Sequence, residues 1–310
     1  MKITGLVLLM IVSFANAQDL QKIAIKAKGA KALSYSPDNQ YFALSNGSSI
    51  ELYNAGNDTK IKDFNGNVNN VRAGHQRDIL DVAFSNNSTM LATASADKTI
   101  KLWKLPAGEV TATLEGHLSG VMAVRFADND KYIVSVSEED GVKVWEILTS
   151  KLIYSKKDFV KPVRAFDVSN DGKHFVVGGG DKDILLYETA TGNIKHKLSG
   201  HKDWIRSLAF SPDGKNLASG GDDKQVLLWD VESGNKLKEF PQRGWIYDLE
   251  FSLDGKYLGL GLEKNSVSFY NLSTGLIALK IDDFKNPVFK MTISPGGKEA
   301  ATIEEFDTDV

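Results

Sequence analysis

The chain has 310 residues, no cysteine and a formal net charge of −3, with 42% hydrophobic and 25% charged residues. A mildly acidic chain whose charges of both signs are interspersed lacks the basic surface that nucleic acids and anionic membranes attract, so we expect no nucleic-acid partner. The absence of cysteine excludes disulfides, thiolate metal ligands, cysteine nucleophiles and lipid anchors attached to cysteine.

Residues 1–17 have the pattern of a secretory signal peptide. Lys2 supplies a positive charge, residues 6–14 are apolar, and Ala15-Asn16-Ala17 has the small residues of a cleavage site. The apolar run is shorter than the ~20 residues that a membrane-spanning helix needs. We therefore expect cleavage of this segment, a folded domain at 18–310 without membrane insertion, and export to the periplasm, the cell surface or the medium.

From about residue 20 onward the chain repeats one unit, which is most complete at residues 200–230. Three strands, Ile205–Phe210, Asn216–Ser219 and Val226–Trp229, are separated there by turns that contain Pro, Asp and Gly. From the second copy on, the residue that ends the first strand recurs in steps of 41 or 42 residues. The seven positions are Tyr35, Phe84, Phe126, Val168, Phe210, Phe251 and Ile293. Such a period predicts an all-β repeat protein.

The units resemble the WD-repeat β-propeller family. The resemblance is carried by Gly-His pairs, Ser-Pro-Asp turns and Trp endings, namely Gly74-His75, Gly116-His117, Gly200-His201, Ser36-Pro37-Asp38, Ser211-Pro212-Asp213-Gly214, Ile100-Lys101-Leu102-Trp103 and Trp229-Asp230. It implies a seven-bladed propeller of six full repeats and a partial seventh, closed by an N-terminal strand around residues 20–25. Propellers host many unrelated activities, so the fold alone leaves the function open.

Two places depart from the repeat. The stretch 54–74 is seven or eight residues longer than the repeat requires. We interpret it as a lengthened surface hairpin rather than a binding loop. The seventh unit ends early, so its third strand is missing or compressed into residues 306–310.

Three units contain a histidine, an acid 22 residues later and a tryptophan six residues after the acid. The three sets are His75, Asp97 and Trp103; His117, Glu139 and Trp145; and His201, Asp223 and Trp229. With a strand hydroxyl, a histidine and an acid could form a hydrolase triad. Catalysis needs one site, however, whereas this set recurs in three units. The resemblance implies a hydrogen-bonded chain inside each blade, so we interpret these residues as structural.

The register also predicts one exposed cluster. Trp204, Arg206, Trp245 and Tyr247, with Arg164 beside them, occupy equivalent positions at the start of the first strand in successive units. In the family these positions lie at the channel mouth. Tryptophan and arginine are the residues that dominate protein interfaces, so this cluster is a candidate partner-binding site. The alternative is that the two tryptophans only pack between blades.

Two functions follow as hypotheses. The first is a non-catalytic, monomeric scaffold that docks a protein or peptide on the top face of the propeller. The alternative is an enzyme or a binding protein for a small anionic ligand, with Arg164, Arg206 and Lys31 at the channel mouth. No acid, base, nucleophile, phosphate-binding loop or metal cluster stands out from the repeat. The sequence therefore favours the scaffold, with no catalytic residue, cofactor or metal.

Overall fold

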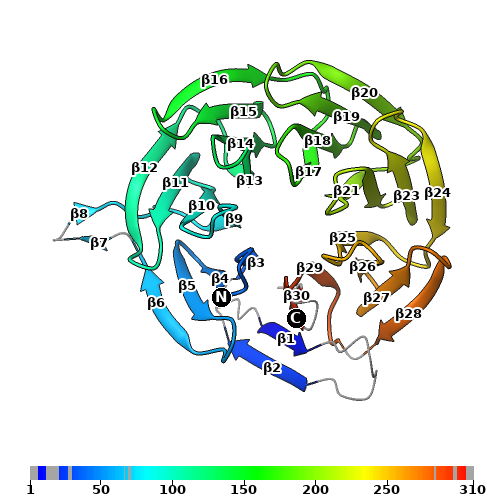
Figure 1. The fold of residues 1–310 in the computed structure, drawn as a ribbon, viewed down its shortest axis with the longest axis horizontal. Helices are drawn as coiled ribbons and strands as arrows, with labels where there is room; N and C mark the ends of the chain where they lie inside the picture. The colour runs from blue at the N-terminus through cyan, green and yellow to red at the C-terminus, as the bar shows by residue number, and fades with distance from the viewer. Residues whose placement is uncertain are drawn as a thin grey trace, which may run out of the picture. The chain divides into compact units, whose positions relative to one another are not determined.

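The structure is a computed structural model that describes residues 30–65, 71–282, 284–295 and 299–304, together with three strands at Leu6–Ile11, Gln21–Lys26 and Asn67–Val68. For those three strands and for residues 71, 72 and 299 it describes the backbone alone. The elements are β-strands, labelled β1 to β30 in Figure 1, so the all-β prediction is confirmed. Contacts divide the chain into two compact units. We call Lys26–Asp158 the N-terminal unit, and Phe159–Val310 with Gly5–Ile25 the C-terminal unit.

The N-terminal unit contains three antiparallel sheets of four strands each, here called blades 1 to 3. Blade 1 consists of β3 (Leu33–Tyr35), β4 (Tyr41–Asn46), β5 (Ser49–Asn54) and β6 (Lys60–Phe64). Blade 2 consists of β9 (Ile79–Phe84), β10 (Met90–Ser95), β11 (Thr99–Lys104) and β12 (Glu109–Glu115). Blade 3 consists of β13 (Val121–Ala127), β14 (Tyr132–Ser137), β15 (Gly141–Glu146) and β16 (Lys151–Lys156). Between blades 1 and 2, β7 (Asn67–Val68) and β8 (Val71–Arg72) pair as a small hairpin, as predicted for the extra residues.

The C-terminal unit contains blades 4 to 6, each again one sheet of four consecutive strands. Blade 4 consists of β17 (Val163–Val168), β18 (His174–Gly179), β19 (Asp183–Glu188) and β20 (Ile194–Ser199). Blade 5 consists of β21 (Ile205–Phe210), β22 (Asn216–Gly221), β23 (Gln225–Asp230) and β24 (Lys236–Pro241). Blade 6 consists of β25 (Ile246–Phe251), β26 (Tyr257–Leu262), β27 (Ser266–Asn271) and β28 (Leu276–Ile281).

The structure thus has six blades that each form from one continuous stretch of chain, where the sequence predicts seven blades. The remaining strands, β29 (Val288–Ile293) and β30 (Glu299–Glu304), pair with β1 (Leu6–Ile11) and β2 (Gln21–Lys26) in the order β2-β1-β30-β29. The repeat register places the outermost strand, β2, correctly. It does not identify β1, which pairs with β30 from inside the predicted signal segment. Residues 306–310 lie outside the described residues, so their predicted strand is not assessed.

The cores lie between adjacent blades rather than inside one sheet. The second and third strands of a blade are buried on both faces, as in β22 and β23, and consist mainly of apolar and small residues. The outer strands are exposed and charged, as in β24. Phe210 of blade 5, for example, packs with Val176 and Leu186 of blade 4. Each fully buried side chain of this size contributes about 1.5–3 kcal/mol to folding.

Candidate functional site

Two of the three predicted histidine sets, those of blades 2 and 5, form hydrogen-bonded chains with the predicted members. In blade 2, His75 Nδ1 lies 2.9 Å from Asp97 Oδ2 and His75 Nε2 lies 2.6 Å from Thr93 Oγ1, which accepts the Trp103 Nε1 hydrogen at 2.8 Å. In blade 5, the distances of His201 to Asp223 and Ser219 are 2.8 and 2.7 Å, and Trp229 donates to Ser219 at 2.8 Å.

Blade 3 corrects one predicted residue. The partner of His117 is Asp140 and not the predicted Glu139. His117 Nδ1 lies 3.1 Å from Asp140 Oδ2, whereas Glu139 is exposed. His117 Nε2 and Trp145 Nε1 both meet Ser135 Oγ, at 2.8 and 2.9 Å.

The reason for this correction is the conformation of the turn after the second strand. In blades 2 and 5 the acid directly precedes a residue with positive φ, Lys98 at 75° and Lys224 at 62°. In blade 3 the positive φ of 91° belongs to Gly141, one position later. The acid that precedes it is Asp140, which takes the place of Asp97 and Asp223. Because glycine adopts this conformation at no steric cost, it shifts the turn by one residue.

Burial closes these chains off from solvent. The His117 side chain is fully buried and Ser135 has no exposed surface, so neither reaches a substrate in solution. Because a carboxylate only accepts, His117 Nδ1–H donates to Asp140 and leaves Nε2 as the acceptor of the Ser135 hydroxyl hydrogen. Burial is the main cause that lowers the pKa of His117 to about 4, so the imidazole is neutral at pH 7.

The exposed cluster predicted from the register has two groups in the C-terminal unit. In the first, the Arg206 guanidinium lies 5.4 Å from the ring centre of Trp245 and 5.2 Å from that of Tyr247. The two rings are perpendicular, with centres 6.5 Å apart. Arg206 is also held by both carboxylate oxygens of Asp222, through Nε and through a 2.9 Å bond from its terminal nitrogen. Arg206 is therefore fixed in one orientation between two half-buried rings.

In the second group, exposed Arg164 lies 5.9 Å from the ring centre of half-buried Trp204. The ring of Trp204 lies over Gly180 in the preceding blade, where an added Cβ would approach two ring atoms to 3.0 Å. Glycine at 180 therefore allows the Trp204 ring to approach blade 4 closely. We call Arg164, Trp204, Arg206, Trp245 and Tyr247 the Trp–Arg cluster.

Sequence reasoning missed Asp222, the acid that orients Arg206. Asp222 directly precedes Asp223, and only one of two adjacent acids can join the histidine chain, so the pair Asp222-Asp223 was an available signal. The register also places Phe289 at the position equivalent to Tyr247, outside the predicted cluster, and 43% of its surface is exposed. Whether the Trp–Arg cluster binds a partner stays a prediction.

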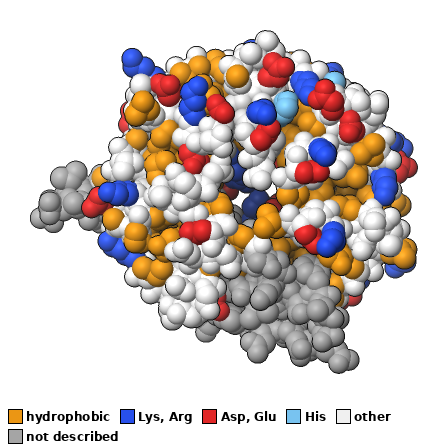
Figure 2. All heavy atoms as spheres, in the orientation of Figure 1, with side chains coloured by type: hydrophobic (Ala, Val, Ile, Leu, Met, Phe, Trp, Pro, Cys, Tyr) orange, Lys and Arg blue, Asp and Glu red, His pale blue; other side chains and the backbone are white. Residues whose placement is uncertain are grey.

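Within the described ranges, no three or more His, Cys, Asp or Glu side chains are placed to hold a metal ion. No helix in the described part of the chain is long and apolar enough to cross a membrane. Charged side chains of both signs are interspersed on the face drawn in Figure 2.

Comparison with known proteins places the chain among repeat proteins. The family described as "WD domain, G-beta repeat" matches residues 66–104, 108–146 and 192–230. These are the repeats that end in Trp103, Trp145 and Trp229, the tryptophans of the three histidine chains. A stretch of 100 residues, 32% of this chain, is 30% identical to "Periodic tryptophan protein 2" of Saccharomyces cerevisiae, and the match covers 11% of that protein.

The matched repeats agree with the sheets of the structure. Three units of the chain match WD repeats, and the described strands form all-β sheets of four antiparallel strands, the arrangement of β-propeller blades.

Proposed function

We propose that this protein is a non-catalytic interaction module that docks a protein or peptide through the Trp–Arg cluster. The observation that carries the proposal is the arrangement around Arg206, which is held by a bidentate acid and has the centres of two aromatic rings 5.4 and 5.2 Å from its guanidinium. Aromatic rings and a pre-oriented arginine are the groups that contribute most to protein interfaces, because they bury a large area at a small cost in side-chain entropy.

The cluster also indicates the chemistry of the partner. Trp204, Trp245 and Tyr247 offer half-buried apolar area, and exposed Arg164 lies against Trp204. A segment with an apolar side chain next to a carboxylate matches both, since an arginine stacked on a ring still donates in its own plane. The docked segment would cover the inner-strand ends of blades 4 to 6.

The proposal is tested with peptides selected from a random display library against the purified protein. We expect the double change Trp204→Ala and Trp245→Ala to weaken the selected peptides by about 30-fold or more, because loss of a central aromatic anchor typically costs about 2 kcal/mol or more. Fluorescence anisotropy of labelled peptide measures the affinity. The melting temperature should change little, because both rings are only half buried.

Leu148→Ala is the matched control, since Leu148 is 92% exposed and lies outside the cluster. It should leave affinity unchanged. If the selected peptides bind the double variant with the same affinity as the unchanged protein, the docking surface lies elsewhere. Unfolding of the double variant would make the two tryptophans part of the core.

The alternative, a small anionic ligand held by Arg164, Arg206 and Lys31, has less support. Arg206 is already paired with Asp222, and Lys31 Nζ lies 2.9 Å from Asp78 Oδ2. A ligand anion would have to compete with both carboxylates, each of which is tethered beside its cation.

We further propose that the protein is exported and acts as a monomer outside the cytoplasm. The support is the signal pattern of residues 1–17, whose cleavage would remove β1 and leave β2 without its neighbour in the order β2-β1-β30-β29. Intact-mass measurement of protein recovered from its native cells shows whether residues 1–17 have been cleaved or retained. We expect a chain that begins at Gln18. A chain that retains Met1 would refute export by this signal and would be consistent with β1 as a strand of the fold.

A further inference from the structure

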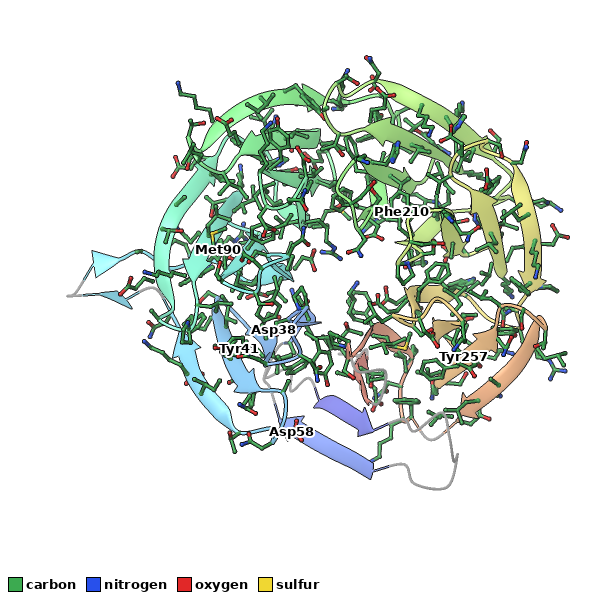
Figure 3. The ribbon with its side chains drawn as sticks, in the orientation of Figure 1. Asp38, Tyr41, Asp58, Met90, Phe210 and Tyr257 are labelled. Carbon is green, nitrogen blue, oxygen red and sulfur yellow. The ribbon has the colours of Figure 1, made fainter. Side chains whose placement is uncertain are left out.

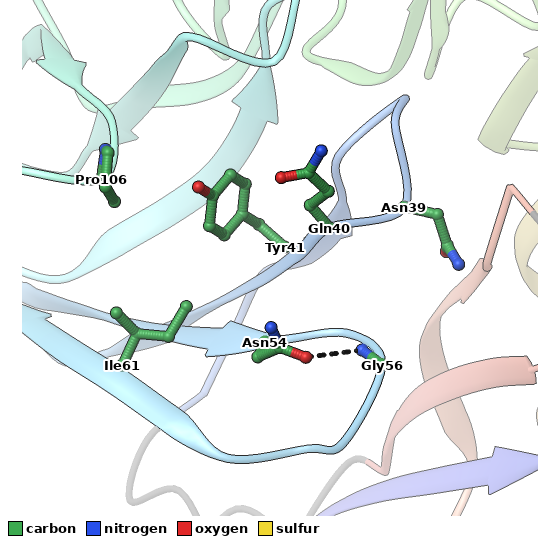
Figure 4. A pocket seen from close by; sticks show the side chains of 7 residues that line it. All are labelled: Asn39, Gln40, Tyr41, Asn54, Gly56, Ile61 and Pro106. Carbon is green, nitrogen blue, oxygen red and sulfur yellow. Dashed lines mark hydrogen bonds between the residues drawn. The ribbon is translucent and has the colours of Figure 1, made fainter.

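A hollow of about 450 Å³ opens in the N-terminal unit, far along the chain from the Trp–Arg cluster. It is lined by Asn39, Gln40, Tyr41, Asn54, Gly56, Ile61 and Pro106. Figure 4 shows Tyr41 between Gln40, Ile61 and Pro106, with Asn54 at the base. Its volume lies within the ~300–1,000 Å³ typical of small-ligand sites, but its lining is richer in polar groups than is usual.

The side of the hollow between β3 and β4 is held in place by internal hydrogen bonds. Ser36, fully buried, donates to Asp38 Oδ1 at 2.6 Å and accepts the Tyr41 N–H at 2.9 Å. Asp38 Oδ1 accepts the Gln40 N–H at 3.0 Å. Figure 3 shows Asp38 and Tyr41 together on blade 1. Because these hydrogen bonds fix the backbone of the turn, the backbone of Asn39 and Gln40 does not have to become ordered when a ligand binds.

Blade 1 differs from blades 4 to 6 at these two positions. Three other turns have the same Ser-x-Asp core but continue with Gly-Lys, at Gly172-Lys173, Gly214-Lys215 and Gly255-Lys256. All three glycines have positive φ, and so does Asn39, at 58°. Asparagine adopts this conformation less readily than glycine. Blade 1 thus has a carboxamide where the others have no side chain, and uncharged Gln40 where they have a lysine.

The polar groups that line the hollow are neutral. Asn54 Oδ1 accepts the Gly56 N–H at 2.9 Å, which leaves its amide hydrogens as donors to the hollow (Figure 4). Among the described residues, the Tyr41 hydroxyl makes no hydrogen bond. The nearby Lys60 is paired with Glu51 and Asp63, at 3.0 and 2.7 Å. The lining therefore offers amide and phenol groups beside apolar surface, without a charge among its members.

We propose that this hollow binds a neutral carbohydrate. Each carboxamide both donates and accepts, which matches sugar hydroxyl groups that do the same. The Tyr41 ring, Ile61 and Pro106 offer apolar surface to the C–H face of the sugar ring. A charged ligand would find no counter-ion in the lining, and an apolar ligand would leave the carboxamides without partners. This inference is independent of the proposed docking function.

The test uses saturation-transfer difference NMR with the methyl glycosides of glucose, galactose, mannose and N-acetylglucosamine, with glucuronate and trialanine as comparison probes. We expect at least one neutral glycoside to give a signal, and glucuronate and trialanine to give none. Tyr41→Phe removes only the hydroxyl and should weaken the glycoside about fivefold, the effect of one lost hydrogen bond.

The decisive variant carries Asn39→Gly with Gln40→Lys, because it gives blade 1 the turn of blades 4 to 6 and is therefore compatible with folding. It should weaken the glycoside more than tenfold. Lys215→Gln in blade 5 is the control and should have no effect. The proposal is overturned if no neutral glycoside gives a signal, if the double variant binds it equally well, or if trialanine binds in its place.

Discussion

Replacing Trp103 with alanine should lower the free energy of unfolding by about 3–5 kcal/mol. Trp103 has no exposed surface, and its ring stacks on Phe64 of blade 1 with centres 6.1 Å apart. It belongs to the core shared by blades 1 and 2, so the cavity would open between two sheets rather than at an edge. The change also removes the Nε1 donor from Thr93 Oγ1. Equilibrium urea denaturation measures the loss.

Trp103→Phe separates the two contributions. It keeps most of the buried apolar area and removes the hydrogen bond to Thr93, so it should cost clearly less than the alanine variant. Trp245→Ala is the second comparison, because Trp245 is only half buried. Equal losses for Trp103→Ala and Trp245→Ala would contradict the placement of the core between the blades.

The blades could be predicted from sequence because their physics is local and repeated. The strand predicted at Ile205–Phe210 is β21 with the same bounds, since a two-residue alternation and a Pro-Asp-Gly turn determine both of its ends. The histidine chains were predictable for the same reason. Their members lie in one blade, and the spacing between strands is constant from blade to blade.

Asp140 was not predictable from spacing alone. Glu139 and Asp140 are both acids in the same turn, and the choice depends on the positive φ of Gly141, a backbone property that the repeat spacing does not express. β1 was missed for another reason. A short apolar run such as Leu6–Ile11 has no period that distinguishes a buried strand from the apolar part of a signal peptide.

The hollow beside Tyr41 was not predictable because it forms between segments of two blades. Asn39 and Asn54 belong to blade 1, whereas Pro106 follows β11 of blade 2. In the sequence these residues are ordinary turn residues. Only the packing of the blades shows that their side chains share one space.

The second large effect concerns pH, and it arises from His117. Burial, with a smaller contribution from Lys143, lowers the pKa of this imidazole from 6.5 to about 4, although the nearby Asp140 carboxylate opposes the shift. The unfolded chain therefore takes up a proton at His117 as the pH falls below 6.5, whereas the folded chain does not until about pH 4. Between these values the folded state loses stability steadily, by about 3 kcal/mol in all from this residue.

His117→Gln removes that titration, and its comparison with the unchanged protein is the measurement we propose. At pH 7 the variant should be less stable, because it breaks the chain from Asp140 to Trp145. Toward pH 4.5 the difference in free energy of unfolding should shrink by about 2–3 kcal/mol, because only the unchanged protein loses the contribution of His117. Glu139→Gln should follow the unchanged protein at every pH, since Glu139 is exposed and lies outside the chain. Parallel curves for His117→Gln and the unchanged protein would mean that His117 titrates at its ordinary pKa and that the buried chain does not hold it neutral.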